Sequence, residues 1–199
     1  MKKILLSIVA ITIGFTSLAQ ENVIKANIFS PLFKTGSFFY ERALSDQTSA
    51  QLGFYFTAFN IGDSKWRGFG ITPEFRYYPM AEGINGFYIA PFLRYQSLTV
   101  TQTYTDYTDI YDSNGIIIGT TSEEKEAKGT LSTFGGGALI GRQWIFGEHV
   151  SLDIFIGPSF NAGSISYDGD TTDPDSPTFD AGSFDGFGVR TGVTLGFAF

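Results

Sequence analysis

The amino-acid sequence alternates between apolar residues and small or polar residues with a period of two, in segments of about ten residues. In residues 186–199 the odd positions hold mainly Phe, Val and Leu, whereas the even positions hold mainly Gly. Successive side chains of a β-strand point to opposite faces, so each segment predicts a strand with one apolar and one small or polar face. No convincing helical period competes with this pattern after Val23. Eight strands are predicted, the first two from a weaker pattern: residues 23–29, 37–44, 51–59, 68–78, 87–96, 130–144, 151–163 and 186–199.

The composition favours strands and narrows the available chemistry. Glycine (24 residues), Phe (21) and Tyr (10) are abundant among the 199 residues, and this combination disfavours long helices. The absence of cysteine excludes disulfides, thiolate metal sites and a cysteine nucleophile. The single histidine, His149, leaves little for acid–base or zinc chemistry. The net charge of −7 argues against nucleic acid as a partner.

Residues 1–19 have the three parts of a cleaved secretory signal peptide. Lys2 and Lys3 form a basic start, an apolar stretch follows as far as Phe15, and residues 17–19 are Ser-Leu-Ala. The apolar stretch is shorter than the roughly 20 residues of a membrane-spanning helix, which disfavours an N-terminal anchor. We therefore expect export, followed by folding of residues 20–199 as one domain.

The connections between the predicted strands alternate in length. Residues 45–48, 79–85 and 145–150 are short, whereas residues 109–128 and 167–185 are long and acidic. Short turns on one side, longer loops on the other and an even number of strands are typical of a transmembrane β-barrel. The sequence therefore predicts an all-β fold, an eight-stranded antiparallel up-and-down transmembrane β-barrel.

The same alternation also fits a soluble lipocalin-like barrel, in which the apolar face points inward around a ligand. The polar face favours the membrane barrel, because it mixes glycine and small residues with seven charged side chains: Lys25, Glu41, Glu74, Arg76, Arg94, Asp153 and Arg190. Near the predicted strand ends, aromatic residues suggest the aromatic girdle of a membrane barrel: Trp66, Tyr77, Tyr95 and Trp144. In residues 130–144, which include three consecutive glycines, the pattern leaves the facing open.

The last strand has a polar residue and a glycine, followed by hydrophobic and aromatic residues at fixed offsets: Arg190, Gly192, Leu195, Phe197 and Phe199. With residues 38–42 (Phe-Phe-Tyr-Glu-Arg) and 137–144 (Gly-Ala-Leu-Ile-Gly-Arg-Gln-Trp), this strand resembles those of small bacterial outer-membrane β-barrel proteins, the OmpA- and OmpX-like group. The resemblance implies location in the outer membrane, contact with its lipid, and recognition of the last strand by the outer-membrane assembly machinery.

An eight-stranded barrel is just wide enough inside to be filled by side chains. The seven charged interior residues are expected to form ion pairs, because an unpaired buried charge costs several kcal/mol. A plugged barrel favours a structural or interaction role: membrane integrity, surface contact, or an accessory subunit of a larger outer-membrane complex. The alternative is a narrow channel or small-ligand transporter, and a soluble lipocalin-like binder is a third possibility.

The sequence offers little support for an enzyme. A catalytic triad needs a nucleophile within hydrogen-bond reach of its histidine, and Ser151 is too close in sequence to His149 to provide one. Residues 135–137 are not followed by a helix, so these glycines are not expected to form a phosphate-binding loop. We expect neither catalysis nor a cofactor.

Two segments are expected to lie outside the membrane. Residues 97–130 are strand-prone but polar on both faces, which predicts a projecting hairpin that turns at residues 112–115. This hairpin is either a solvated loop or an edge that adds a strand from a partner. In the second segment, residues 167–185, four carboxylates are a weak Ca²⁺ candidate whose spacing departs from the EF-hand loop: Asp168, Asp170, Asp173 and Asp175. A solvated acidic loop without a metal is favoured there.

Overall fold

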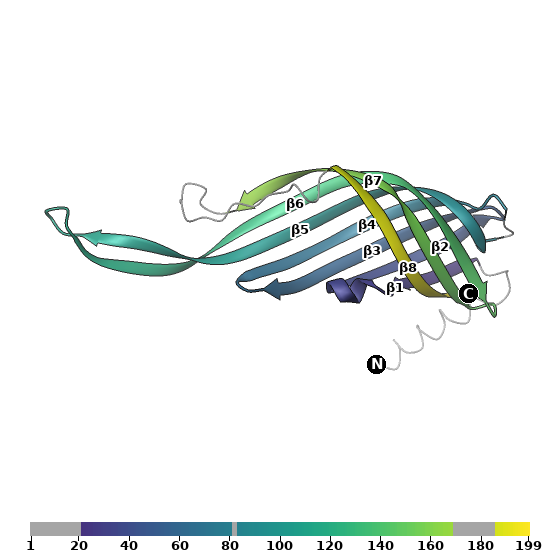
Figure 1. Cartoon of the computed structure of the whole chain (residues 1–199), viewed down its shortest axis with the longest axis horizontal. Helices are drawn as coiled ribbons and strands as arrows, with labels where there is room; N and C mark the ends of the chain where they lie inside the picture. Colours follow the sequence, from purple (N-terminus) through teal and green to yellow (C-terminus); the bar gives the residue numbers. More distant parts are fainter. Residues whose placement is uncertain (1–20, 81–82, 169–185) are drawn as a thin grey trace, which may run out of the picture.

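In a computed structural model of the chain, which describes residues 21–80, 83–168 and 186–199, eight antiparallel strands form one closed barrel (Figure 1). Each strand pairs with the next along the chain, and β1 closes the ring by pairing with β8. The strands are β1 (Asn22–Asn27), β2 (Thr35–Ser45), β3 (Thr48–Ile61), β4 (Ser64–Tyr77), β5 (Gly86–Tyr111), β6 (Ile117–Phe146), β7 (Val150–Asp168) and β8 (Gly186–Ala198). The prediction of an eight-stranded antiparallel up-and-down barrel is confirmed.

The described part of the chain contains little besides strands. One short 3-10 helix, η1 (Ser30–Phe33), connects β1 to β2, and no described helix is long and apolar enough to cross a membrane. The predicted signal peptide and most of the acidic segment 167–185 lie outside the described residues.

Short turns lie at one end of the barrel, where the chain also ends (Figure 1). Only Asp46 and Gln47 separate β2 from β3, and residues 147–149 connect β6 to β7. Gly147 and Glu148 have positive φ angles of 54° and 73°, as tight hairpin turns require.

The outward face of the barrel is apolar from the short-turn end to about the same level on neighbouring strands. Large exposed hydrophobic side chains are present on all eight strands, including Ile24 (β1), Phe38 (β2), Phe54 (β3), Ile71 (β4), Ile89 (β5), Ile140 (β6), Ile154 (β7) and Leu195 (β8). On the side away from the short turns, these side chains end at three pairs of facing residues on adjacent strands: Phe56 with Phe69, Tyr95 with Phe134, and Phe160 with Phe187. We call this continuous outward surface the apolar belt.

Beyond the belt, the outward positions become polar or basic. The next outward residue away from the short turns is Arg67 after Phe69 on β4, Ser97 after Tyr95 on β5, and Ser132 after Phe134 on β6. On β4 the belt extends from Phe69 to Tyr77, about the nine to eleven residues with which a tilted strand crosses a bilayer.

The facing of β6, which the sequence left open, follows from the burial of its odd positions. Leu131, Thr133, Leu139 and Gln143 point into the barrel. The glycines between them allow close approach of the neighbouring strands: a Cβ on Gly137 would lie 2.1 Å from the carbonyl oxygen of Pro158 on β7.

The prediction that Trp66 belongs to an outward aromatic girdle is wrong. Trp66 points into the barrel, where it stacks on Phe59 with ring centroids 5.8 Å apart. The cause is the length of β4, which begins at Ser64 rather than at residue 68 and keeps Trp66 on the inward face with Thr72 and Glu74.

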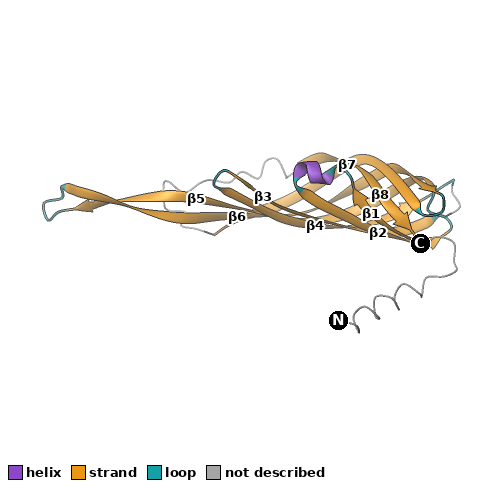
Figure 2. Ribbon diagram, turned by 90° about the horizontal axis from the view of Figure 1, so that it is seen from below, coloured by secondary structure: helices purple, strands orange, loops and turns teal. Residues whose placement is uncertain are grey.

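Strands β5 and β6 continue far beyond the rest of the barrel as a two-stranded ribbon (Figures 1 and 2). Pairing of β5 with β4 ends at Gln102, and pairing of β6 with β7 begins at Lys128. Among the described strands, residues 103–111 and 117–127 therefore pair only with each other. We call residues 103–127 the ribbon. The hairpin predicted for residues 97–130 is present, and its strands extend closer to the tip than the long connection expected at residues 109–128.

Candidate functional site

Six charged side chains from five strands meet inside the barrel. They are between 0% and 6% exposed and comprise three cations and three carboxylates: Lys25 (β1), Glu41 (β2), Glu74 and Arg76 (β4), Asp153 (β7) and Arg190 (β8). Each occupies an inward position of its strand, so the alternation that makes the outside apolar also brings these charges to the barrel axis. We call this set the charge network.

Lys25 and Arg76 bridge the same two carboxylates. The Lys25 Nζ atom donates to Glu41 at 2.6 Å and to Asp153 at 3.1 Å. The Arg76 Nη1 atom lies 2.9 Å from Asp153 and 3.3 Å from Glu41. Removing all four charges from water is costly, and their mutual attraction together with these hydrogen bonds offsets part of that cost.

Glu74 joins a second arginine to the same network. Its Oε2 atom accepts from Arg76 Nη2 at 3.2 Å, and its Oε1 atom accepts from Arg190 Nη2 at 2.5 Å. The Arg190 guanidinium also lies over the Phe92 ring, 4.6 Å from its centroid, and over Phe155 at 5.1 Å. Phe92 and Phe155 therefore hold this cation against the inner wall.

Neutral side chains complete the hydrogen bonding of the carboxylates. Tyr78 and Ser49 donate to Glu41, and Tyr88 donates to Asp153 at 2.8 Å. Gln51 donates to Glu74 at 3.0 Å, and Gln143 accepts from Lys25 at 2.7 Å. Sequence reasoning did not single out these five residues, although all five are buried at inward positions.

Apolar side chains surround the charge network and fill the barrel on the side of the short turns. Val23, Ile84, Leu139 and Ala198 are at most 2% exposed and pack with Tyr78 and Tyr88. The network and this packing together occupy the cross-section of the barrel.

Arg94, the seventh charged residue of the predicted interior, lies outside the charge network. Its Nε atom donates to Thr72 Oγ1 at 3.3 Å, and its guanidinium lies 5.7 Å from the Phe92 centroid. Among the described residues, no carboxylate forms an ion pair with it.

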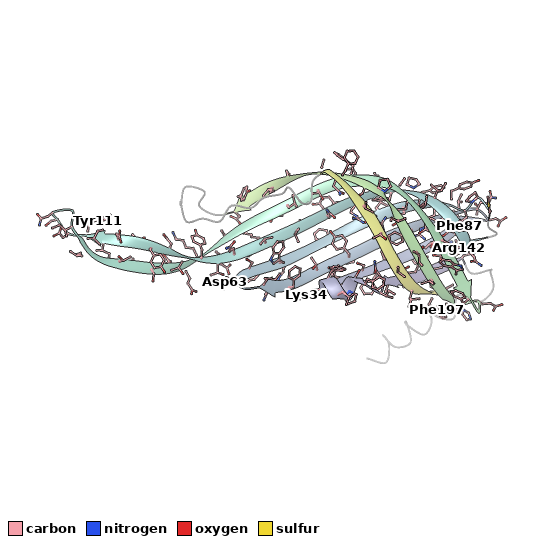
Figure 3. All side chains as sticks on the ribbon, in the orientation of Figure 1. Lys34, Asp63, Phe87, Tyr111, Arg142 and Phe197 are labelled. Atoms are coloured by element: carbon pink, nitrogen blue, oxygen red, sulfur yellow. The ribbon has the colours of Figure 1, made fainter. Side chains whose placement is uncertain are left out.

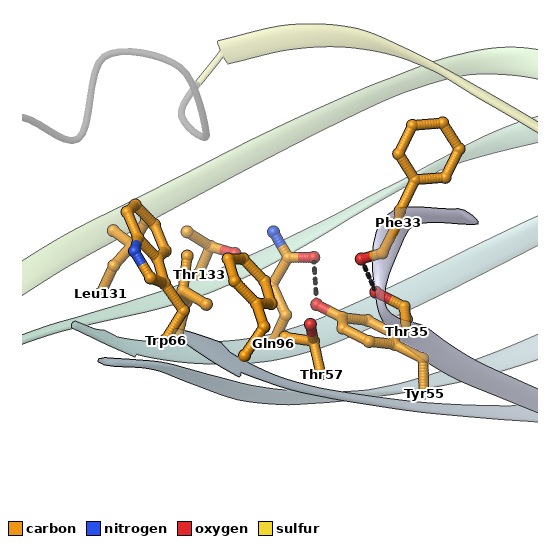
Figure 4. Close-up of a pocket in the computed structure, with 10 residues that line it drawn as sticks. Phe33, Thr35, Tyr55, Thr57, Trp66, Gln96, Leu131 and Thr133 are labelled. Carbon is orange, nitrogen blue, oxygen red and sulfur yellow. Dashed lines mark hydrogen bonds between the residues drawn. The ribbon is translucent and has the colours of Figure 1, made fainter. Parts of the chain in front are cut away.

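Two cavities lie on the ribbon side of the charge network. The first, of about 270 Å³, is lined by Tyr55, Thr72, Arg94 and Arg190 among others. The second, of about 440 Å³, is lined by Tyr55, Trp66, Leu98 and Leu131 among others (Figure 4). Tyr55 borders both cavities and donates from its hydroxyl to Gln96 at 3.1 Å. We call these two neighbouring cavities the vestibule; the smaller is lined by the two arginines, and the larger is mainly aromatic and apolar.

The residues of the predicted assembly signal divide between the two faces of β8. Arg190 points inward into the charge network, and Gly192 is buried. Leu195 and Phe197 are exposed on the apolar belt, and Phe199 forms backbone hydrogen bonds with Asn22 at the end of β1.

Aromatic side chains and Arg142 lie on the outer surface at the short-turn end (Figure 3). The Arg142 guanidinium is 4.6 Å from the Phe87 centroid and 4.9 Å from Trp144. His149 stacks on Phe197, with ring centroids 5.2 Å apart, and its Nδ1 atom lies 3.2 Å from the Ala198 carbonyl oxygen. The ring of His149, the single histidine of the sequence, is therefore engaged by Phe197 and by the Ala198 carbonyl group.

The ribbon is acidic, with six carboxylates and one lysine in residues 103–127. That lysine, Lys125, pairs with Asp106, and Glu126 pairs with Lys65 of β4 at 2.8 Å. At the tip, the Asp112 carboxylate accepts from the backbone amides of Ile116 and Asn114, and these hydrogen bonds lower the pKa of Asp112. The tip also exposes a cluster of large apolar residues: Tyr107, Ile110, Tyr111, Ile116, Ile117 and Ile118.

Of the four carboxylates proposed as a weak Ca²⁺ candidate, only Asp168 is described, at the end of β7 opposite Lys128. The other three lie outside the described residues. Among the residues that the structure describes, no group of three or more His, Asp or Glu side chains is placed to hold a metal ion.

Comparison with known proteins gives a family but no function. No curated protein matches the chain. Among solved structures, the N-terminal β-barrel domain of Pseudomonas aeruginosa OprF is similar at 11% identity and a TM-score of 0.35, over 90% of this chain and 98% of that chain. A family model described as "Protein of unknown function (DUF3575)" matches residues 4–168. That match spans most of the barrel, and the chain therefore belongs to the DUF3575 family.

Proposed function

We propose that this protein is an outer-membrane β-barrel without enzymatic activity, and that its role is to present the ribbon to another protein. The ribbon carries the proposal, since two strands extend beyond the barrel with edges that no described strand covers. Membrane integrity and participation in a larger outer-membrane complex belong to the same class of role.

The apolar belt supports a membrane location. Soluble monomers rarely expose a contiguous apolar surface larger than a few hundred Å². Here large exposed hydrophobic side chains surround the barrel and end at one height on several strands, as contact with a hydrocarbon layer requires. Outer-membrane lipid is therefore the proposed partner of the belt, and the outer-membrane assembly machinery is the proposed partner of the last strand.

The charge network supports a structural role over diffusion of solutes. Buried ion pairs and packed apolar side chains occupy the interior between the vestibule and the short turns. A solute as large as a sugar would have to displace several of these contacts to pass. The runner-up function, a narrow channel, would require the same contacts to open.

The ribbon supports contact with another protein. Unpaired backbone donors and acceptors along a strand edge can add a strand from a partner. The exposed apolar tip provides an additional surface, and the excess of carboxylates favours a partner with basic residues.

Photocrosslinking in the native host tests this role. A benzophenone amino acid replaces Tyr107 of the ribbon, which is 65% exposed, or Tyr95 of the apolar belt, which is 40% exposed, as the matched control. We expect a discrete protein adduct from Tyr107 and none from Tyr95, because only the ribbon lies beyond the lipid. The absence of a protein adduct at Tyr107 and at a second ribbon site, Ile117, would contradict the proposal. The same adduct from both tyrosines would place the contact on the barrel instead.

A further inference from the structure

Among the described residues, the interior of the barrel has one more cation than carboxylates. Lys25, Arg76 and Arg190 are balanced by Glu41, Glu74 and Asp153 within the charge network. Arg94 adds a fourth positive charge on the vestibule side, and no Asp or Glu of the described part of the chain lines either cavity. A partly buried cation without a counter-charge is a costly arrangement, and an anion in the vestibule would offset that cost.

A buried hydrogen-bond donor is directed at the same place. Arg190 is 6% exposed and lines the smaller cavity, and its Nη1 atom is buried with no hydrogen-bond partner among the residues that the structure describes, whereas Nη2 is bonded to Glu74. Arg94 lines the same cavity, and both guanidiniums lie against Phe92. Two guanidiniums at one site can bind a carboxylate through several charge-assisted hydrogen bonds.

The larger cavity suits an apolar body attached to that acidic group. Along β3 the inward positions run from Gln51, which donates to Glu74 of the charge network, through Tyr55 to Phe59 near the β3–β4 turn. Trp66, Leu98 and Leu131 extend the same apolar surface, and Figure 4 shows Trp66 and Tyr55 directed into the cavity. The larger cavity, of about 440 Å³, is within the roughly 300–1,000 Å³ of small-molecule pockets, and the smaller cavity adds about 270 Å³.

We propose that the vestibule binds a small carboxylic acid with an aromatic or aliphatic body, its carboxylate held by Arg94 and Arg190. The apolar body lies between Tyr55, Trp66 and Leu98. The ligand enters from the ribbon side, because the charge network closes the other side. This site is separate from the proposed partner contact of the ribbon, so either proposal can fail without the other.

Trp66 makes this site measurable by fluorescence. The chain has two tryptophans, and Trp144 lies on the outer surface, so the Trp144→Phe protein reports from the vestibule alone. This protein, refolded into phospholipid vesicles, is titrated with 3-phenylpropionate and with 3-phenylpropylamine, which has a similar body and the opposite charge. We expect a saturable change of Trp66 fluorescence with the acid and at least tenfold weaker binding of the amine.

Two arginine substitutions separate the vestibule from non-specific adsorption. Arg94→Gln removes a vestibule cation outside the charge network, and we expect it to weaken binding of the acid at least tenfold in protein that still folds, as shown by far-UV circular dichroism. The matched control, Arg142→Gln, removes a cation from the outer surface and leaves binding unchanged. Equal binding of acid and amine, a non-saturable signal, or unchanged binding in folded Arg94→Gln protein would overturn the proposal.

Discussion

Replacement of Arg76 by leucine lowers the free energy of unfolding of the barrel by about 3–5 kcal/mol, the usual cost of leaving a buried charge without its partner. Arg76 is 0% exposed and contacts all three carboxylates of the charge network. Without it, Glu41 and Asp153 share only Lys25 as a charged partner, and Glu74 retains only Arg190. Urea titration of the protein refolded into lipid vesicles measures the change.

Three further variants, Lys65→Ala, Asp153→Asn and the Arg76→Leu/Asp153→Asn double variant, show whether the loss comes from the charge network. Lys65→Ala breaks the exposed pair with Glu126 and is expected to cost at most about 1 kcal/mol. Adding Asp153→Asn to Arg76→Leu removes one of the uncompensated carboxylates, so the double variant should be less destabilised than the sum of the single variants by about 0.5–3 kcal/mol. If Arg76→Leu costs no more than Lys65→Ala, the charge network does not stabilise the barrel.

If the apolar belt faces lipid as proposed, replacement of Ile154 by arginine destabilises the barrel in a bilayer by about 2–4 kcal/mol, because the cation would then lie near the middle of the membrane. Ile154 of β7 is 43% exposed and lies opposite Val193, midway along β8. The fraction of protein that folds into vesicles, followed by gel migration with and without heating, measures the effect together with a urea titration.

The matched control is Ile118→Arg in the ribbon. Ile118 is the more exposed of the two isoleucines, at 66%, but the ribbon lies beyond the apolar belt. An arginine there remains in water, so we expect a change within about 0.5 kcal/mol, as for other surface substitutions. Equal effects of the two substitutions would mean that Ile154 does not face lipid.

The alternation in the sequence was sufficient to predict the strand number, the closed barrel and the facing of most strands. A period of two assigns a side chain to a face without knowledge of its neighbours, as for Glu74 and Arg76 on β4. The assignment fails where the strand is longer than predicted. The start predicted at residue 68 excluded Trp66 from β4, although the structure extends that strand to Ser64 and turns Trp66 inward.

The contacts within the candidate site could not be predicted from the sequence. Alternation places Lys25 and Asp153 on inward faces, but only the register across several strands brings Lys25 Nζ within 3.1 Å of Asp153. Arg94 shares the inward parity of Arg76 yet lies outside the charge network, because position along the barrel axis depends on the stagger between strands. For the same reason, the vestibule could not be inferred from the sequence.

Spin labelling tests most directly whether the apolar belt faces lipid. Because the chain contains no cysteine, each single-cysteine variant carries one label. Labels at Ile71 and Leu195 report on the belt, and a label at Ile118 reports on the ribbon. In vesicles, collision with oxygen should exceed collision with a water-soluble nickel chelate at Ile71 and Leu195, and the order should reverse at Ile118. Greater accessibility to nickel at all three positions would contradict the assignment of the outer surface to the membrane.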